Sequence, residues 1–529
     1  MLGSVFQYFA EITGQKVAAA QARAVARGVY PHPKIPVGYV RGENGVLVVE
    51  PAAAKVVVQA FKRRDLGASH VEIQALLAEN GIERALSGVA SMLRSRMWIE
   101  TSIGWNESNL AEGRLPTAGE LDRATREHPV LARRGGHTAV ANTLALRKAK
   151  LGTGRPDPAA GTIERSGNGG LSDVIEGAAI YRVRNLIPPP STLQDADALA
   201  RVSRSYAALG VGTIREAQLE PGEFLAYQSA WEQDALAVRA RPMLRVDSGA
   251  SLEERMSYIE GLGMRSGFGD DRLRVWGLKF VLDGGVAGAA LNDPYADDPT
   301  NRGDLNWDPD ELCSVMSAAV RTGWKVATHA VGDRSVNTLL DAYERIVETN
   351  PDLPPGALVI EHGFLAGREQ RARAIRLGVA VTVQHQLLYN YARELRERWG
   401  EQRTALVMPV RSWLQEGALV AGGTDAAKPF DTMLSLWGFV TRGTRDAGVQ
   451  GPDQRLDPDT AVALNTAAGA RLLGESDRLG TIQVGRLADI VALTADPLTT
   501  QIDGLRSITP ALTLLAGHPT HDPQSLLGG

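Results

Sequence analysis

The sequence predicts an α/β protein whose main part is a (β/α)8 barrel of the TIM type. Short β-prone runs alternate with helix-like stretches from about residue 205 onward, and this alternation is typical of parallel βαβ units. Several of the runs end on a polar residue, as expected in a barrel that carries its active site at the carboxyl ends of its strands. The chain has 529 residues and is therefore long enough for more than one domain.

Seven runs carry the strand pattern of apolar and β-branched residues. The stretches between them have helical character, and in residues 335–350 the side chains of Val336, Leu339, Leu340 and Tyr343 form one apolar stripe at helical spacing. A count of seven such strands favours a closed barrel over an open sheet. The runs are 211–217, 241–249, 274–283, 325–330, 357–362, 379–385 and 418–425.

Composition and charge restrict the class of protein. Hydrophobic residues make up 44% of the chain and charged residues 22%, and the net charge of −4 excludes a polyanion binder that uses its whole surface. Residues 1–97 hold 12 Lys and Arg against 7 Asp and Glu, whereas the remainder holds 45 against 54. This split indicates two pieces with different origins or partners.

The cellular location is predicted to be the cytoplasm. Cys313 is the single cysteine, so an internal disulfide is excluded and a reducing compartment is expected. The N-terminal residues lack the basic start and apolar core of a secretion signal. No apolar run approaches the roughly 18 residues that a membrane helix needs.

Chemically active residues stand in or at the ends of four predicted strands. Lys279 lies in the run 274–283, while His329, His362 and Asp425 lie at or near the ends of three others. A single histidine at a strand end is most often structural, but imidazole and carboxylate on several strands of one barrel predict a site for zinc or a similar divalent ion. A lysine becomes a ligand only when it is neutral or carboxylated to a carbamate.

Longer stretches resemble a known family. Residues from about 98 to 515 are similar to the amidohydrolase superfamily, specifically the amidohydrolase-3 or YtcJ-like branch that includes N-substituted formamide deformylases. The stretches that carry the resemblance are HPVLARRGGHTAVANTLAL (128–146), GLKFVLDGGVAGAALNDPY (277–295), THAVGD (328–333), IEHGF (360–364), GGTD (422–425) and LNTAAGARLLGESDRLGTIQVGRLADIVAL (464–493).

The resemblance implies metal-assisted hydrolysis of a C–N bond in an amide or formamide. It implies Lys279 as a carboxylated bridging lysine, His329 and His362 as ligands of the second metal, and Asp425 as both a ligand of the first metal and the general base. The other metal or His137 would polarise the carbonyl, or His137 is a structural residue after Gly135 and Gly136. The closing segment would belong to a small β-sandwich.

One element of the family pattern is missing. Members open with β-sandwich strands and a first barrel strand that ends in His-x-His, but the nine histidines of this chain include no pair spaced i, i+2. We therefore expect a barrel without its first strand and a site that holds one divalent ion, zinc above others, more readily than two. Unpaired sheet edges and impaired activity follow, and the edges would have to be covered by an N-terminal segment, by another subunit in a homo-oligomer or by a chaperone.

The N-terminal segment resembles a different family. Residues of about 20–97 are similar to the recombinase domain of large serine recombinases, on the pieces Pro36–Tyr39, Phe61, Gly67–Ser69 and Asn80–Ile82. In that family the region binds DNA, so the second hypothesis is a DNA-binding fragment that carries an inactive barrel. The basic residues that fit weak phosphate contacts, or form only a solvated helix face, are Lys62, Arg63, Arg64, Arg94 and Arg96.

Three domains are therefore predicted. Residues 1–97 form the recombinase-like segment, which we expect to be a small α+β unit. Residues 98–470 form the barrel and include an insertion at 98–200. Residues 471–529 form a C-terminal helix and the remnant of the β-sandwich.

Overall fold

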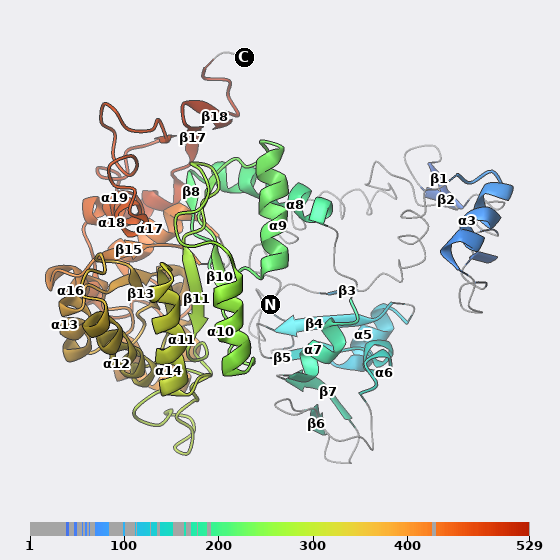
Figure 1. Cartoon of the computed structure of the whole chain (residues 1–529), viewed down its shortest axis with the longest axis horizontal. Coiled ribbons are helices and arrows are strands. Elements are labelled where there is room, and N and C mark those ends of the chain that lie inside the picture. The colour runs from blue at the N-terminus through green and yellow to red at the C-terminus, as the bar shows by residue number, and fades with distance from the viewer. Residues whose placement is uncertain are drawn as a thin grey trace. The chain divides into compact units, whose positions relative to one another are not determined.

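The computed structural model divides the chain into two compact units (Figure 1). One consists of Met1 and Phe6–Ser191, and the other of Leu2–Val5 and Thr192–Gly529. The residues that the structure describes are 39–41, 47–49, 56, 59–60, 63, 69–83, 99–100, 110, 112, 114–126, 128–134, 138–151, 163–165, 171–176, 178–187, 192–425 and 430–527.

The first unit begins with a hairpin and a short helix. Strands β1 (Tyr39–Arg41) and β2 (Leu47–Val49) pair antiparallel, and helix α3 (His70–Glu79) follows. The helix starts where it does because Ser69 Oγ accepts from the Glu72 amide while the Glu72 carboxylate accepts from the Ser69 amide. This reciprocal cap satisfies two backbone donors that a helix end otherwise leaves without partners.

A five-stranded sheet forms the rest of the first unit. Its order is β3-β4-β5-β7-β6, with β3 parallel to β4 and the other neighbours antiparallel. Buried Asn142 joins sheet and helix, because its Oδ1 accepts from the Val130 amide at 2.9 Å and the Ala145 amide at 3.0 Å. The elements are β3 (Ile99–Glu100), α5 (Ala118–Ala124), β4 (Val130–Arg134), β5 (Thr138–Ala141), α6 (Thr143–Lys148), β6 (Ile163–Arg165), β7 (Leu171–Glu176) and α7 (Ala178–Arg184).

Parallel strands form the centre of the second unit, and their spatial order follows the sequence. Six of them make one sheet in the order β10-β11-β12-β13-β14-β15, and β8 pairs in parallel with β9, which directly precedes β10. The strands are β8 (Thr213–Ile214), β9 (Arg239–Ala240), β10 (Met243–Arg245), β11 (Gly277–Val281), β12 (Val326–Ala330), β13 (Leu358–His362), β14 (Ala380–Val383) and β15 (Val420–Gly422).

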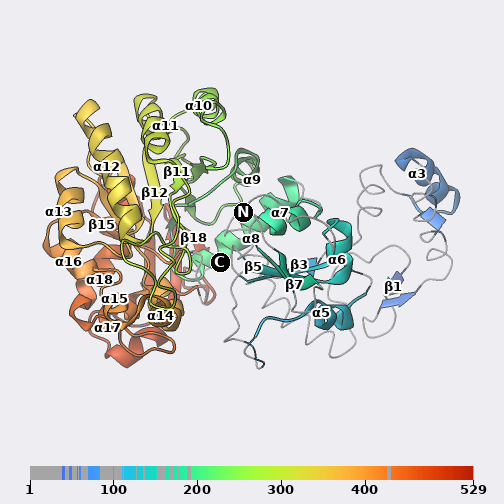
Figure 2. The same cartoon turned by 90° about the horizontal axis from the view of Figure 1, so that it is seen from below.

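Helices alternate with these strands and pack beside them, as α11 and α12 do along β11 and β12 (Figure 2). The predicted stripe on α12 is confirmed, since Val336, Leu339, Leu340 and Tyr343 are fully buried. The helices are α8 (Thr192–Ala207), α9 (Pro221–Glu232), α10 (Leu252–Gly261), α11 (Pro309–Arg321), α12 (Asp333–Thr349), α13 (Arg368–Arg376), α14 (His385–Trp399), α15 (Glu401–Ala405) and α16 (Val410–Gln415).

The sheet has two ends in the part of the chain that the structure describes. There, β8 pairs only with the segment 239–245, and β15 pairs only with β14. The predicted parallel strands and their order are confirmed, whereas closure into a barrel remains a prediction.

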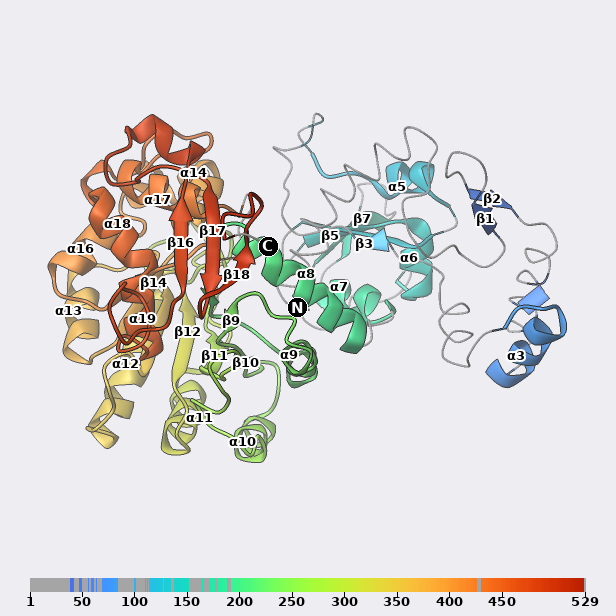
Figure 3. The ribbon, with the colours of Figure 1, turned by 90° about the horizontal axis from the view of Figure 1, so that it is seen from above.

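A small antiparallel sheet follows the last helices. Its order is β16-β17-β18, and the strands lie side by side in Figure 3. The Thr513 hydroxyl on β17 donates to the Ala207 carbonyl at 2.7 Å and so ties this sheet to the end of α8. The elements are α17 (Thr432–Thr441), η3 (Pro452–Gln454), α18 (Pro458–Asn465), α19 (Ala467–Leu473), β16 (Ile490–Leu493), η4 (Ile502–Ser507), β17 (Pro510–Leu515) and β18 (His518–His521).

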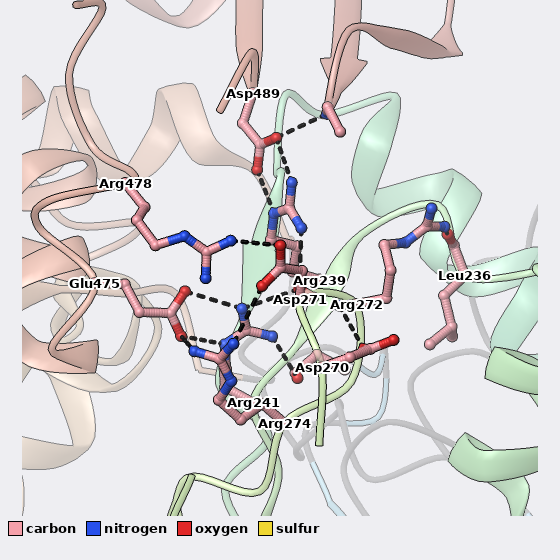
Figure 4. A network of polar contacts seen from close by, with 12 residues as sticks. Leu236, Arg239, Arg241, Asp270, Asp271, Arg272, Arg274, Glu475, Arg478 and Asp489 are labelled. Atoms are coloured by element: carbon pink, nitrogen blue, oxygen red, sulfur yellow. Dashed lines mark hydrogen bonds and ion pairs between the residues drawn. The ribbon is translucent and has the colours of Figure 1, made fainter. Parts of the chain in front are cut away.

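A network of arginines and carboxylates holds the C-terminal segment against the parallel sheet (Figure 4). Arg241 is 1% exposed and binds Glu475 through two hydrogen bonds of 2.6 and 2.9 Å. Arg239 binds Asp489 in the same two-bond manner at 2.6 and 2.8 Å. Such two-bond contacts between a guanidinium and a carboxylate add geometric specificity as well as binding energy.

Two predictions about organisation and location remain open. The predicted domain boundaries near residues 97 and 470 stay predictions, as does the cytoplasmic location. No helix in the described ranges combines the length and apolar character that crossing a bilayer requires.

Candidate active site

The four predicted site residues lie at or near the carboxyl ends of four parallel strands. Lys279 is the third residue of β11, His329 is the fourth of β12, and His362 is the last of β13. The prediction that Asp425 closes a strand is wrong in detail, because β15 ends at Gly422 and Asp425 stands three residues beyond it. Parallel register therefore directs all four toward one end of the sheet.

The two histidines lie against each other. Their ring centroids are 4.7 Å apart and their planes are nearly perpendicular, at 76°. His329 donates Nε2–H to the Gly284 carbonyl at 3.1 Å, and His362 donates Nδ1–H to Gln384 Oε1 at 2.8 Å. Because a carbonyl oxygen only accepts, these contacts leave Nδ1 of His329 and Nε2 of His362 as the nitrogens with lone pairs.

Burial favours the neutral form of both imidazoles. It lowers the pKa of His329 well below the usual value, and the neighbouring His362 and Lys279 act in the same direction. Burial also lowers the pKa of His362, although the Asp425 carboxylate opposes this shift. A neutral imidazole is the form that binds metal ions.

Lys279 is buried among charges inside the sheet. Its side chain is 2% exposed, and burial lowers its pKa to about 8, with Glu361 opposing the shift and Arg215 adding to it. A substantial neutral fraction at slightly alkaline pH follows, and only a neutral amine can be carboxylated.

Two of the four residues adopt unusual backbone angles. His362 has φ of 78° and Asp425 has φ of 53°, in the left-handed region that residues with a side chain seldom occupy. Strain of this kind costs on the order of 1–3 kcal/mol and is concentrated at functional sites. The Asp425 carboxylate lies 4.0 Å from His362 Nδ1, which brings the carboxylate to the histidine pair.

Beneath the histidines lies an ion pair that sequence reasoning missed. Arg215 beside β8 contacts the Glu361 carboxylate, and its guanidinium stacks on Trp276 at 4.6 Å. Burial raises the pKa of Glu361, but Arg215 and Lys279 together outweigh it and bring the pKa to about 2. The available signal was Arg215 in the run TIREA and Glu361 in the run ALVIEH, two residues of opposite charge on two predicted strands.

Asp283 is a second residue that the sequence did not reveal. Its buried carboxylate accepts hydrogen bonds from the amides of Ala290, Val331 and Gly332 and from the Ser335 hydroxyl. Burial raises its pKa to about 6, although these donors oppose the shift. Because Asp283 Oδ1 is 3.6 Å from His329 Nε2, this carboxylate helps to place the His329 ring.

The donor set fits a divalent ion in part. Ligand histidines characteristically bind an oxygen acceptor through their second ring nitrogen, as both histidines do here. Within the described ranges, however, no group of three or more His, Cys, Asp or Glu side chains is arranged to hold an ion. Lys279, whose charge acts on both histidines, is the further donor that the sequence predicted.

Of the other predicted site residues, Arg63 alone lies within the described ranges. His137 lies outside the described residues, and so do Lys62, Arg64, Arg94 and Arg96. Arg63 is described and exposed. A carbonyl-polarising role for His137 and phosphate contacts by the basic residues stay predictions.

Several relatives resemble this chain in sequence, and a solved structure shares its fold. The Bacillus subtilis (strain 168) protein YtcJ, named as an amidohydrolase, is 25% identical over 461 residues, which cover 85% of each chain. The N-substituted formamide deformylase of Arthrobacter pascens is 25% identical over 435 residues, 79% of this chain and 78% of that enzyme. The crystal structure of an uncharacterized metal-dependent hydrolase from Pyrococcus horikoshii OT3 has the same fold, with a TM-score of 0.63 at 24% identity over 84% of this chain and 85% of that one.

The model of the amidohydrolase family matches residues 68–521. The match begins inside the segment with recombinase-like motifs, and the resemblance of residues 20–97 to recombinases stays a prediction. The strand order, the histidine pair and a match over most of the chain lead to one conclusion: the chain belongs to the amidohydrolase family.

Proposed function

We propose that this chain is a metal-dependent hydrolase that cleaves the C–N bond of a small amide, with N-substituted formamides as the first candidates. The observation that carries the proposal is the pair of neutral imidazoles at the strand ends, each bonded to an oxygen through one nitrogen and free to ligate through the other. The formamide class is suggested by the deformylase of Arthrobacter pascens.

His329 and His362 would hold one divalent ion, zinc above others, with Lys279 as a third donor in its neutral or carboxylated form. Such an ion lowers the pKa of a bound water from ~15.7 to about 7, so hydroxide is present at neutral pH. Asp425, which is partly exposed, would take the proton from the attacking water and deliver it to the leaving nitrogen. His137 is the candidate for polarising the substrate carbonyl.

We also propose that this chain hydrolyses its substrate more slowly than a relative that has the His-x-His pair. The chain has no His-x-His pair, so a second ion lacks two of the ligands that the family pattern provides. One tightly held ion per chain is therefore expected.

Metal content and turnover of the purified chain test the proposal together. We expect at most about one zinc or manganese ion per chain, together with slow hydrolysis of N-formyl and N-acyl amines. His329→Ala should lose both the ion and the activity, whereas Asp425→Asn should lose chiefly the activity. His521→Ala, on β18 of the C-terminal sheet, is the control and should change neither quantity.

Two ions per chain, or turnover equal to that of an intact relative, would show that the missing histidines are dispensable. No bound ion and no turnover in the wild-type chain would leave the inactive-barrel hypothesis in its place.

A further inference from the structure

A continuous line of hydrogen bonds joins the buried ion pair to His362. Arg215 contacts Glu361, Glu361 accepts from the Thr382 hydroxyl, Gln384 Nε2 donates to Thr382 Oγ1 at 2.9 Å, and Gln384 Oε1 lies 2.8 Å from His362 Nδ1. Glu361, Thr382, Gln384 and His362 are all buried, with at most 9% of any of them exposed. Water therefore has little access with which to rearrange these bonds.

The donor and the acceptor of every bond can be assigned by starting at Arg215, because its guanidinium can only donate. A guanidinium has donors only, so the Glu361 carboxylate accepts from Arg215. The Thr382 hydroxyl has one proton and two lone pairs. Its oxygen accepts from Gln384 Nε2 at 2.9 Å and from the His362 amide at 3.4 Å, so its proton goes to Glu361.

The same logic fixes the side-chain amide and the imidazole. Because Gln384 presents its NH2 group to Thr382, its carbonyl oxygen must face His362. The nitrogen that faces this oxygen is Nδ1, which must then carry the ring proton. The Asp425 carboxylate, another acceptor, lies on the same side of the ring at 4.0 Å.

We propose that Arg215, Glu361, Thr382 and Gln384 are positioning residues, which act as a one-directional hydrogen-bond relay that holds His362 in its Nδ1–H tautomer and presents the Nε2 lone pair to a ligand. The consequence for metal binding rests on the proposed function, whereas the tautomer itself does not. In free solution an imidazole exchanges between its two neutral tautomers, and the relay removes the one that cannot ligate through Nε2. The pair Arg215–Glu361 acts on the tautomer through the Thr382 hydroxyl, which donates to the Glu361 carboxylate.

Isosteric changes of the relay give a sharp test. Glu361→Gln keeps the shape but can donate to Thr382, which lets the hydroxyl and the Gln384 amide reverse. Thr382→Val removes the hydroxyl, whereas Thr382→Ser keeps it and is the matched control. The thermal unfolding of each full-length variant is first compared with that of the wild type, to show that the variant folds.

The first readout is the tautomer of His362 in metal-free protein, from the imidazole nitrogen shifts of histidine-labelled samples assigned with His362→Ala. Wild type and Thr382→Ser should show Nδ1–H, while Glu361→Gln and Thr382→Val should populate Nε2–H. The second readout is zinc affinity from competition with a chromophoric chelator. It should fall by about 10- to 100-fold in the two relay variants, as expected when partners of metal ligands are removed.

An Nε2–H tautomer in the wild type, or an unchanged tautomer in both folded relay variants, would overturn the proposal. If the substitutions at Glu361 and Thr382 prevent folding, Gln384→Glu and Gln384→Met replace them, because only the first retains an acceptor for Nδ1–H. A wild-type chain that shows the Nδ1–H tautomer but binds no zinc would refute the proposed hydrolase and leave the relay intact.

Discussion

Removal of the Glu475 carboxylate should strongly destabilise the second unit. In the native chain Arg241 is 1% exposed and binds Glu475 through two hydrogen bonds, at 2.6 and 2.9 Å. Glu475→Ala takes away both bonds and leaves a buried guanidinium with only the carbonyls of Ala240 and Asp271 as partners.

The magnitude follows from two independent considerations. Hydrogen bonds to charged groups contribute about 1.5–3 kcal/mol each, and removing one partner of a buried ion pair costs about 3–5 kcal/mol. Because Arg241 keeps its two carbonyl contacts, we expect a loss in the free energy of unfolding at the lower end of this range, about 3 kcal/mol. For a urea dependence of roughly 3 kcal/mol per molar, the unfolding midpoint should fall by about 1 M.

Tryptophan fluorescence in urea is a suitable assay. The chain has nine tryptophans, and all except Trp98 and Trp105 lie in the second unit. Two variants serve as controls. Arg241→Met combined with Glu475→Leu should recover most of the loss, because it leaves no charge without a partner. Asp310→Ala should leave the midpoint unchanged, because Asp310 and its partner Arg345 are 85% and 59% exposed. A single variant as stable as the wild type, or a double variant no better than the single one, would refute the reasoning.

Three further predictions concern pH, nucleic acid and self-association. Burial lowers the pKa of Lys279 to about 8, so the unfolded chain binds more protons than the folded chain between about pH 8 and 10.5. The free energy of unfolding should therefore rise with pH in this range, by on the order of 3 kcal/mol. Lys279→Met should flatten that rise in urea titrations at several pH values, and an unchanged slope would contradict the assignment. Residues 1–97 should bind DNA weakly, without sequence preference and only at low salt, as a gel-shift titration of the segment and the whole chain can show; absence of binding at low salt would remove the prediction. Because β8 and β15 are the ends of the sheet in the described part of the chain, we expect the chain to associate as its concentration rises. Sedimentation velocity would detect this association, and a monomer at all concentrations would indicate that the edges are covered.

Much of the parallel sheet could be predicted from sequence because its strands are short, apolar and bounded by polar residues. The strand that contains His329 was expected at 325–330 and is found at Val326–Ala330. The position of His362 at the end of β13 followed from the same pattern, whereas Lys279 lies in the middle of β11 and not at its end. Asp425 was placed at the end of a strand because sequence does not separate a strand from the extended turn that follows it.

The polar relay could not be predicted in this way. Arg215 and Glu361 are 146 residues apart, and their contact depends on the register of several intervening strands. Thr382 is an ordinary strand residue in the sequence, and only its neighbours in space give its hydroxyl a direction. The five-stranded sheet of the first unit was likewise missed, because its strands are short and its order places β7 between β5 and β6.

The arginine network of Figure 4 also affects the order in which parts of the chain can fold on the ribosome. The partner of Arg239 is Asp489, which is 250 residues further along the chain. At translation rates of about 5–20 residues per second, roughly 10–50 s pass between the synthesis of the two residues. During that interval Arg239 and Arg241 lack the carboxylates of Asp489 and Glu475 and must stay hydrated. The strands of the parallel sheet can pair as they are synthesised. The sheet reaches its final packing only when the C-terminal segment has emerged from the ribosome.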